Sequence, residues 1–300
     1  MPITEATIRN VRYYPELLPD TRIATVAAGS ELSPPIVDLR RFSPKFVHLV
    51  NISISRVDAT LRLRSEGLRQ EISALVLPDQ SPAPWEVIGT ELLEFTLYSS
   101  TGVSNVPVSY GLWVYEPTVA HKIKHGKPLT SDERKIASDF GIQQSVEKGV
   151  LPLPLSYVIE REYQVIEEIS RGIVTDIGTD ESILDVVVSR PNEVLVLTEI
   201  AAYPGTVANN IRIRIDRDTD SNYLELNTFA MSLDRSIKCF IPALHEFRFK
   251  AIANSLVSGF AARFTVRRCV LTNILKARFR LAGPTEIPGD TWNKVWGGVL

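Results

Sequence analysis

The sequence predicts a mainly β protein built from two duplicated, jelly-roll-like β-sandwich units. A short helical connector joins the units, and an arm flanks them at each end. Two observations predict this fold. Several short segments alternate apolar and polar residues, which is typical of a strand with one buried face. Five segments, of which four are strand-like and the last is helix-like, recur in the same order in the two halves of the chain, which indicates an internal duplication.

The repeated segments share pattern more than identical residues. In chain order the aligned pairs are 36–52 with 183–200, 58–64 with 209–215, 92–98 with 245–251, 106–116 with 259–269, and 117–126 with 270–279. Pro44 and Pro191 coincide in the first pair, at positions where proline is tolerated because a strand begins there. The last pair is helix-like, so each unit is expected to end in a short helix.

These patterns divide the chain into five parts. They are an N-terminal arm (1–30), a first β-sandwich unit (31–126), a helical and extended connector (127–177), a second unit (178–282) and a C-terminal arm (283–300). Turn-rich loops such as 100–105, 201–210 and 216–222 separate the predicted strands. Many short strands without long intervening helices are typical of a sandwich or barrel.

The connector begins with a helical pattern, in contrast to the strand patterns that precede it. Thr130 followed by Glu133 predicts a capping box, and Gly141 is placed to end that helix, as Gly149 is for the next. The segment 157–170 fits either a strand or a helix. We expect a strand, because valine and isoleucine dominate its apolar positions.

Composition and charge indicate which kinds of partner the chain is not expected to bind. The 300 residues are 44% hydrophobic and 23% charged, which is ordinary for a globular protein, and the formal net charge is −2. Basic residues are scattered, so no direct nucleic-acid binding is expected. The most apolar stretch, 149–159, is too short for a membrane span and carries two prolines, and no signal peptide is evident, so no membrane partner is expected. Two buried free thiols are favoured for Cys239 and Cys269, with pairing left open.

The search for chemistry predicts no catalytic residue and no cofactor, and therefore a protein that is not an enzyme. The chain lacks a nucleophile elbow, a Walker loop and a dinucleotide fingerprint. His121 and His125 are four residues apart, but no third ligand lies nearby in the sequence, and Lys122 stands where a zinc protease needs glutamate.

A weak metal candidate lies in the loop 216–222. Asp216, Asp218 and Asp220 occupy alternate positions there, as oxygen ligands do at the start of a calcium loop. The sixth position is Ser221 where such a loop needs glycine, and the twelfth is Asn227 where it needs glutamate. A polar hairpin turn is therefore the favoured interpretation.

Tryptophans suggest contacts rather than chemistry. Trp292 and Trp296 are four residues apart near the C-terminus and are expected to share one helical face that docks in a groove, of this chain or of a neighbour. In the first unit, Trp85 and the pair Trp113 and Tyr115 leave open a carbohydrate-binding module. A large aromatic residue on a strand is nevertheless more often part of the core.

Residues 117–155, which include a compact helix and the string GVLPLP, and residues 196–218, with their NN-containing loop, resemble virion structural proteins of tailed phages and prophages. The resemblance implies an auxiliary capsid, decoration or neck protein with β-sandwich domains and arms. Its partners would be further copies of itself or other virion proteins, and it would reside in the virion after assembly in the host cytoplasm. No functional residue carries over. A carbohydrate-binding module and a hydrolase on a β scaffold remain the alternatives.

Overall fold

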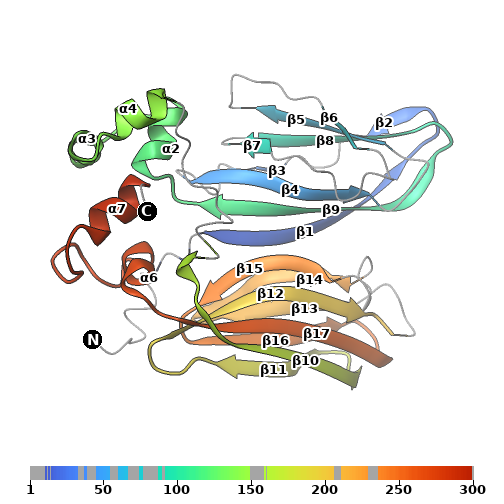
Figure 1. Ribbon diagram of the computed structural model, residues 1–300. Helices are drawn as coiled ribbons and strands as arrows, with labels where there is room; N and C mark the ends of the chain where they lie inside the picture. The colour runs from blue at the N-terminus through green and yellow to red at the C-terminus, as the bar shows by residue number, and fades with distance from the viewer. Residues whose placement is uncertain are drawn as a thin grey trace.

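The computed structural model describes residues 11, 13, 15–32, 37–38, 45–54, 60–66, 74–76, 87–89, 92–148, 159, 161–205, 211–228 and 236–298. The described strands fall into two units (Figure 1). The first unit contains β1 (Glu16–Val26), β2 (Ser30–Leu32), β3 (Val37–Asp38), β4 (Phe46–Ile54), β5 (Thr60–Glu66), β6 (Ala74–Val76), β7 (Val87–Gly89), β8 (Leu92–Ser99) and β9 (Val103–Tyr115). The second contains β10 (Val165–Ile177), β11 (Glu181–Val188), β12 (Glu193–Tyr203), β13 (Ile211–Arg217), β14 (Asp220–Asn227), β15 (Ile237–Ala243), β16 (Glu246–Ala253) and β17 (Val257–Val270).

Each unit is a jelly roll. In the first, the strands run β1-β9-β4-β7 in one layer and β2-β8-β5-β6 in the other, with β3 also paired to β8. In the second, they run β10-β17-β12-β15 and β11-β16-β13-β14. We number the strands of each unit from one to eight in chain order and count β2 and β3 together as the second strand. Both units then have the order one, eight, three, six in one layer and two, seven, four, five in the other. The predicted duplication is therefore confirmed at the level of strand order.

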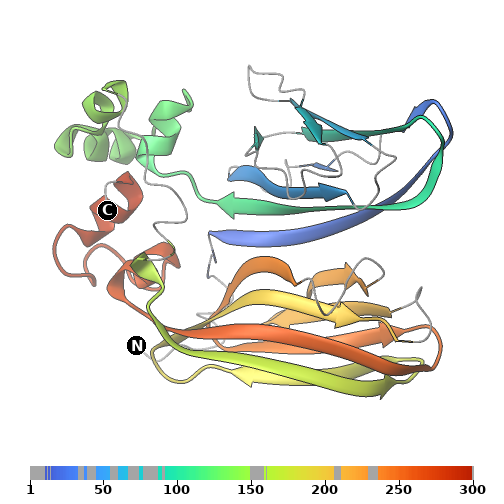
Figure 2. The same ribbon diagram turned by 45° about the vertical axis from the view of Figure 1, so that its right-hand side comes forward.

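The two jelly rolls share a sheet. Strand β1 of the first unit pairs antiparallel with β15 of the second, with Leu17 opposite Phe240, so that one eight-stranded sheet runs from β10 to β7. Figure 2 shows from a second side that the two sandwiches lie one above the other along this junction. The segment assigned to an N-terminal arm thus includes β1, which is a sheet strand.

The structure corrects the residue-level alignment of the two units. Leu63 lies opposite Phe95 in the first unit, whereas in the second unit Arg214 lies opposite Lys250 and Arg248 lies opposite Asp216. The sequence alignment had matched Leu63 to Arg214 and Phe95 to Arg248, which do not lie opposite each other. The repeat was therefore found, but these two matches cannot both be in register.

Local signals explain the helices, which gather at one end of both sandwiches (Figure 1). They are α2 (Val119–Lys124), α3 (Ser131–Asp139), α4 (Ile142–Glu147), α6 (Asn273–Arg278) and α7 (Thr291–Gly297). The capping box of Thr130 and Glu133 is confirmed, and Gly141 follows α3 with the left-handed φ of 59° that favours glycine. As predicted, a short helix follows the last strand of each unit, capped by Thr118 in one and Thr272 in the other. Gly149 lies outside the described residues.

The segment 157–170 is a strand only from Val165 onward. Of the described residues before it, 159, 161 and 162 are helical, so the strand prediction was wrong there. Ile159 and Tyr163 are four residues apart, and both pack into one apolar cluster on the sheet. That spacing places both side chains on one face of a helical turn, and this packing outweighs the β propensity of the segment.

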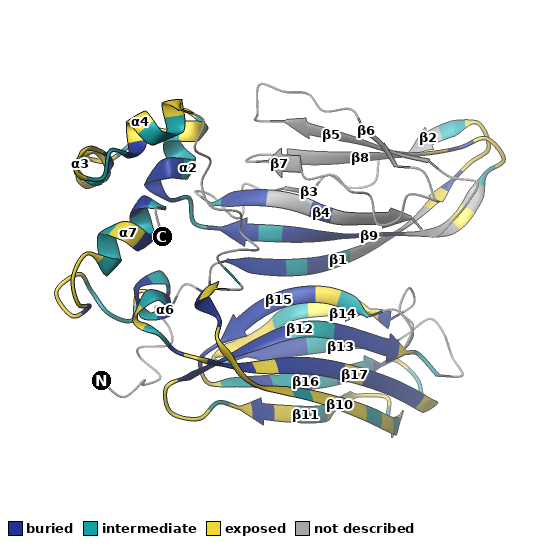
Figure 3. Ribbon diagram, viewed as in Figure 1, coloured by how far each residue is buried: buried dark blue, intermediate teal, exposed yellow. Residues whose placement is uncertain are grey.

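The second unit has an apolar core between its layers (Figure 3). Ile211, Ile213 and Ile215 of β13 are buried while the alternating arginines are half-buried, as the period of two predicted. Phe249 is fully buried and stacks on Phe264 with ring centroids 4.1 Å apart. This core is of a size that stabilises the fold without a disulfide, and Cys239 and Cys269 are both free and buried.

Replacing Phe249 with alanine should lower the free energy of unfolding by about 3–5 kcal/mol, because the lost ring leaves a cavity that its neighbours only partly fill. Chemical denaturation would measure the loss. Tyr203→Ala is the matched control, since Tyr203 is exposed and its replacement should cost no more than about 0.5 kcal/mol. Equal losses in the two variants would contradict this account of the core.

Candidate functional site

The junction between the two jelly rolls carries the most deeply buried ion pair among the described residues. Glu16, on β1, and Arg217, at the end of β13, have side chains only 3% and 7% exposed and are in direct contact. The Tyr223 hydroxyl donates a hydrogen bond to the second carboxylate oxygen at 2.8 Å. A charge this deeply buried is tolerated only when it is paired and hydrogen-bonded, and Glu16 meets both conditions.

Aromatic rings complete this site. The Arg217 guanidinium lies over the ring of Tyr223 at 3.6 Å and over that of Tyr13 at 4.3 Å. The Tyr13 hydroxyl donates to Asp218. Cation–π contacts stabilise a guanidinium that has lost its water, so a segment preceding β1 helps to hold the second unit against the first.

Burial raises the pKa of Glu16, and the neighbouring Arg217 guanidinium and the Tyr223 hydroxyl, which favour the carboxylate, oppose that rise. Burial by itself would lower the pKa of Arg217, but the nearby Glu16 carboxylate outweighs it and the pKa is raised. Arg217 therefore keeps its proton at any physiological pH, and the site acts as a structural clamp between units.

The three aspartates of the loop 216–222 bind protein groups. Asp218, with a left-handed φ of 51°, accepts hydrogen bonds from the backbone N–H groups of His245 at 2.7 Å and Glu246 at 2.9 Å. Asp216 pairs with Lys250 at 2.7 Å, and Asp220 pairs with Arg217 at 3.4 Å. The loop is a hairpin turn that is fastened to its neighbours. In the described part of the chain, no three histidine, cysteine, aspartate or glutamate side chains form a group that could hold a metal ion.

Ion pairs form a ladder across the outer face of the layer β11-β16-β13-β14. Arg214 contacts Glu181 at 2.6 Å and Glu225 at 3.1 Å, and Lys250 contacts Glu181 at 2.6 Å in addition to Asp216. Arg212 extends the ladder through Glu225 at 2.6 Å. Since opposite charges alternate and satisfy one another within the chain, this face is not a single-sign patch that would attract nucleic acid.

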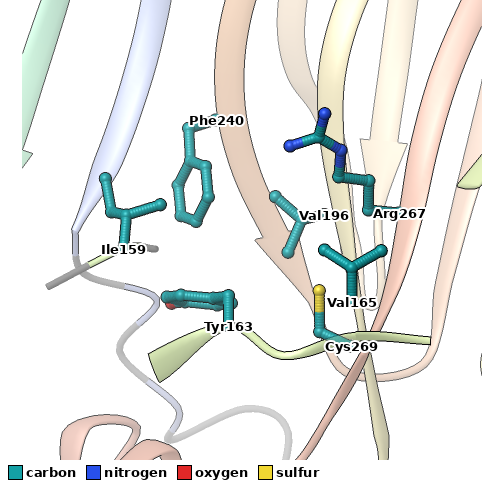
Figure 4. Close-up of a pocket in the computed structure, with 7 residues that line it drawn as sticks. All are labelled: Ile159, Tyr163, Val165, Val196, Phe240, Arg267 and Cys269. Atoms are coloured by element: carbon teal, nitrogen blue, oxygen red, sulfur yellow. The ribbon is translucent and has the colours of Figure 1, made fainter. Parts of the chain in front are cut away.

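A cavity of about 220 Å³ lies beside the connector, against the outer face of the eight-stranded sheet (Figure 4). Its lining residues are Ile159, Tyr163, Val165, Val196, Phe240, Arg267 and Cys269. Burial raises the pKa of the Cys269 thiol to about 11, so at neutral pH it is not the thiolate that a nucleophile requires. Arg267 is held by Glu168 at 2.5 Å. The lining has no histidine or carboxylate to act as a general base.

The structure places the two C-terminal tryptophans on this chain's own helices. Trp292 and Trp296 lie on α7 with ring centroids 6.0 Å apart, as the spacing predicted. They pack with Ile274 and Ala277 of α6, and Arg280 lies 5.0 Å from the ring centroid of Trp296. Of the two dockings that the sequence left open, the intramolecular one is therefore present.

The paired histidines also serve packing. The His121 side chain completes a capping box with Thr118 at the start of α2. The ring of His125 lies edge-on to Phe46 with centroids 5.2 Å apart, and burial lowers the pKa of His125. Trp113 lies 5.6 Å from Phe240, so it packs at the junction. Trp85 lies outside the described residues.

Sequence analysis missed the pair of Glu16 and Arg217. Glu16 lies in the segment that was assigned to an arm, and Arg217 lies in a loop that was examined only for its aspartates. The two residues are distant in the chain, and no local pattern couples them. The one available signal was a charged residue directly preceding the apolar pair Leu17 and Leu18.

Comparisons with known proteins give no family. No family model matches the chain, and no curated protein matches it. Solved structures similar to this chain include three with low TM-scores. The CUB1-EGF-CUB2 domain of human MASP-1/3 has a TM-score of 0.26 and 8% identity over 84% of this chain and 100% of that one. A structure titled as the triple jelly-roll fold and turret assembly in an archaeal virus has 0.27 and 11% over 87% and 59%.

A third match is the PBSX exported protein XepA, with a TM-score of 0.22 and 11% identity over 84% of this chain and 86% of that one. Viral capsid proteins are thus among the weak structural neighbours, but likenesses at these TM-scores carry no argument about function. None of the described helices has the length and apolar character needed to cross a membrane.

Removing Arg217 should destabilise the protein strongly. Arg217→Ala leaves Glu16 buried without its cation, which should cost about 3–5 kcal/mol in the free energy of unfolding. Arg212→Ala removes an exposed pair from the same strand and should cost no more than about 1 kcal/mol. Denaturant titrations would compare the two, and the double variant Glu16→Gln with Arg217→Met should recover much of the loss. Equal small losses at both arginines would refute the clamp.

The ion-pair ladder predicts a pH dependence. The Lys250 ammonium lowers the pKa of Glu181, and for Asp216 it overcomes the opposing effect of burial, so both carboxyls titrate below their usual values. A carboxyl whose pKa is lowered by folding stabilises the protein above its unfolded pKa, and this stabilisation disappears as the pH falls through the folded pKa. Melting temperatures should therefore decline below about pH 4.5.

Lys250→Met should flatten this acid decline, because without the ammonium the two carboxyls titrate closer to their unfolded values. Lys294→Met is the control, since Lys294 is an exposed lysine of α7, remote from the ladder in sequence. Melting curves between neutral pH and pH 3 would measure both. An acid decline that is unchanged in Lys250→Met would show that the ladder does not set it.

Proposed function

We propose that this protein is a structural subunit of a virus-like particle and that it acts through protein–protein assembly, without catalysis. The observation that supports the proposal is the fusion of two jelly rolls through one continuous eight-stranded sheet. The jelly roll is a common architecture of viral capsid domains, although lectins and cupins share it. Fold alone does not decide function, so the proposal also depends on the surfaces.

The surfaces suit contacts better than chemistry. The one cavity described above is lined by apolar residues, a protonated thiol and an ion-paired arginine. The outer charged face is neutralised within the chain. Six large apolar side chains remain exposed on two neighbouring strands of the second unit: Val165, Ile166 and Val174 of β10, and Ile183, Val186 and Val188 of β11. Single exposed apolar residues are common, but these two strands carry six of the nine large apolar side chains that are exposed in the described chain from Val165 onward, which makes them the candidate contact region.

The partners in this proposal are further copies of the chain and other virion proteins, in a particle assembled in the host cytoplasm. Phage capsid, decoration and neck components all fit this description. Carbohydrate binding is the weaker alternative, because Trp113 is packed on Phe240 and is not free to stack on a sugar. No described residue favours the hydrolase alternative.

Purified full-length protein should form defined oligomers well above the 33.5 kDa monomer. Light scattering coupled to size exclusion would measure the mass, and negative-stain electron microscopy would show whether the particles are regular. The fraction assembled should rise with protein concentration, since assembly follows mass action. A strictly monomeric protein over the accessible concentrations would contradict the proposal. Glycan-dependent quenching of tryptophan fluorescence would favour the carbohydrate-binding alternative.

A further inference from the structure

The eight-stranded sheet ends in two strands that have no further strand partner within the described chain. These end strands are β10, in the second unit, and β7, in the first. The outward N–H and C=O groups of an edge strand can pair with another chain, and proteins usually protect them. Figure 1 shows β10 along the edge of the second sandwich, next to β11.

Strand β10 lacks the usual protection of an edge. It is 13 residues long and contains neither proline nor lysine. Its register against β17 shifts only near its two ends, between Val165 and Glu167 and between Thr175 and Ile177. Short length, proline, lysine and a central bulge are the devices that keep edges apart, and the middle of β10 has none of them.

The charges on β10 are already satisfied within the chain. Glu168 pairs with Arg267 at 2.5 Å, Glu167 with Arg268 at 3.3 Å, and Arg171 with Asp185 of β11 at 3.1 Å. The Asp176 carboxylate accepts a hydrogen bond from the backbone N–H of Gly259. Ion pairs within the chain thus neutralise Glu167, Glu168 and Arg171, and an approaching strand would lie beside exposed apolar side chains such as Val174, which is 80% exposed.

The chain itself shows how such an edge is covered. Within one molecule, β1 pairs with β15, so the first strand of one jelly roll joins the sixth strand of the other. By the duplication, β10 is the counterpart of β1, and β7 is the counterpart of β15. The two end strands of the sheet thus hold the same positions in their units as the two strands that already pair inside the molecule. Repeating the internal junction would bring β10 of one copy to β7 of the next.

We propose that β10 pairs antiparallel with β7 of a second copy of this chain, which continues the eight-stranded sheet from one molecule into the next. This inference rests on the proposed function, because it names the surface through which the subunits assemble. The contact is heterologous, since different strands meet. Copies joined in this way form a closed ring if the rotation between them closes, and a filament if it does not.

A charge on the β10 edge should block assembly. Val174→Lys places an ammonium on the edge strand beside the incoming strand, and a lysine on an edge is a device by which proteins prevent pairing with another chain, so the oligomer should fall to the mass of a monomer in light scattering. Tyr203→Lys is the matched control: Tyr203 is also an exposed residue of the same sheet, but it lies on β12, two strands in from the edge. It should leave assembly unchanged. Circular dichroism and melting would establish that both variants are folded.

Crosslinking shows which strands pair between molecules, β10 with β7 or β10 with a second β10. One variant carries Val174→Cys and the other carries Ile88→Cys on β7, and a flexible bis-maleimide is added under native conditions. The native Cys239 and Cys269 are both buried and should react slowly. Head-to-tail pairing predicts crosslinked dimers mainly when the two variants are mixed. Dimers from Val174→Cys alone would indicate that β10 pairs with itself and would overturn the proposal.

The outcomes separate this inference from the proposed function. If the parent protein is monomeric, the proposed function fails and this inference fails with it. If the parent assembles but Val174→Lys assembles equally well, the assembly role stands and the β10 edge is not the interface. If Tyr203→Lys also abolishes assembly, the subunits meet face to face across the sheet, and edge pairing is again overturned.

Discussion

An open β-sheet has an unavoidable constraint: its two end strands carry backbone N–H and C=O groups that no strand of the sheet can satisfy. A jelly roll has two open layers, and two separate jelly rolls would have twice as many edges. In this protein the pairing of β1 with β15 removes one edge from each unit and makes one sheet from two. The position of each other feature, from the buried ion pair to the exposed apolar strands, follows from which edges are covered and which are not.

The covered edge shows what a stable junction needs beyond backbone pairing. Only Leu17 and Phe240 are in register between β1 and β15, so few ladder hydrogen bonds hold the units together. Side chains provide the rest. Tyr163 packs edge-on against Phe240 with ring centroids 4.8 Å apart, and Glu16 pairs with Arg217 beneath two tyrosines. A buried ion pair is a weak source of stability compared with apolar packing, but a mispaired junction would leave either charge alone at great cost. The clamp therefore contributes mainly to specificity, by fixing one arrangement of the two units.

The features that the sequence predicted are local. Alternation of isoleucine and arginine along β13 placed a strand and its buried face correctly, because a period of two depends on neighbours in the chain. The capping box at Thr130 was found for the same reason. The matches of 58–64 and of 92–98 to the second unit were mutually inconsistent because apolar and charged positions alternate in these strands, and an alignment without identical residues cannot choose between nearby offsets. The pair of Glu16 and Arg217 lay beyond prediction, since it depends on the junction between the two units, which brings together residues that are far apart in the chain.

Strands β1 and β10 hold the same position in their two units, so a comparison of their side chains shows how a covered edge differs from an open one. At the junction, β1 carries Glu16 with its buried partner, whereas the counterpart strand β10 carries Glu167 and Glu168, whose side chains are nearly half exposed in their ion pairs. The internal junction is permanent because the chain holds it together at any concentration, so it tolerates the desolvation of a charge. An edge that joins separate molecules depends on concentration, and large desolvation costs would weaken it. Exposed valines and isoleucines flanked by satisfied charges, as on β10 and β11, suit a contact that must form from free subunits. The first strand of each unit thus differs in its side chains. Strand β1 carries a buried ion pair for a permanent junction within the chain, and β10 carries exposed apolar residues for a contact that forms between molecules.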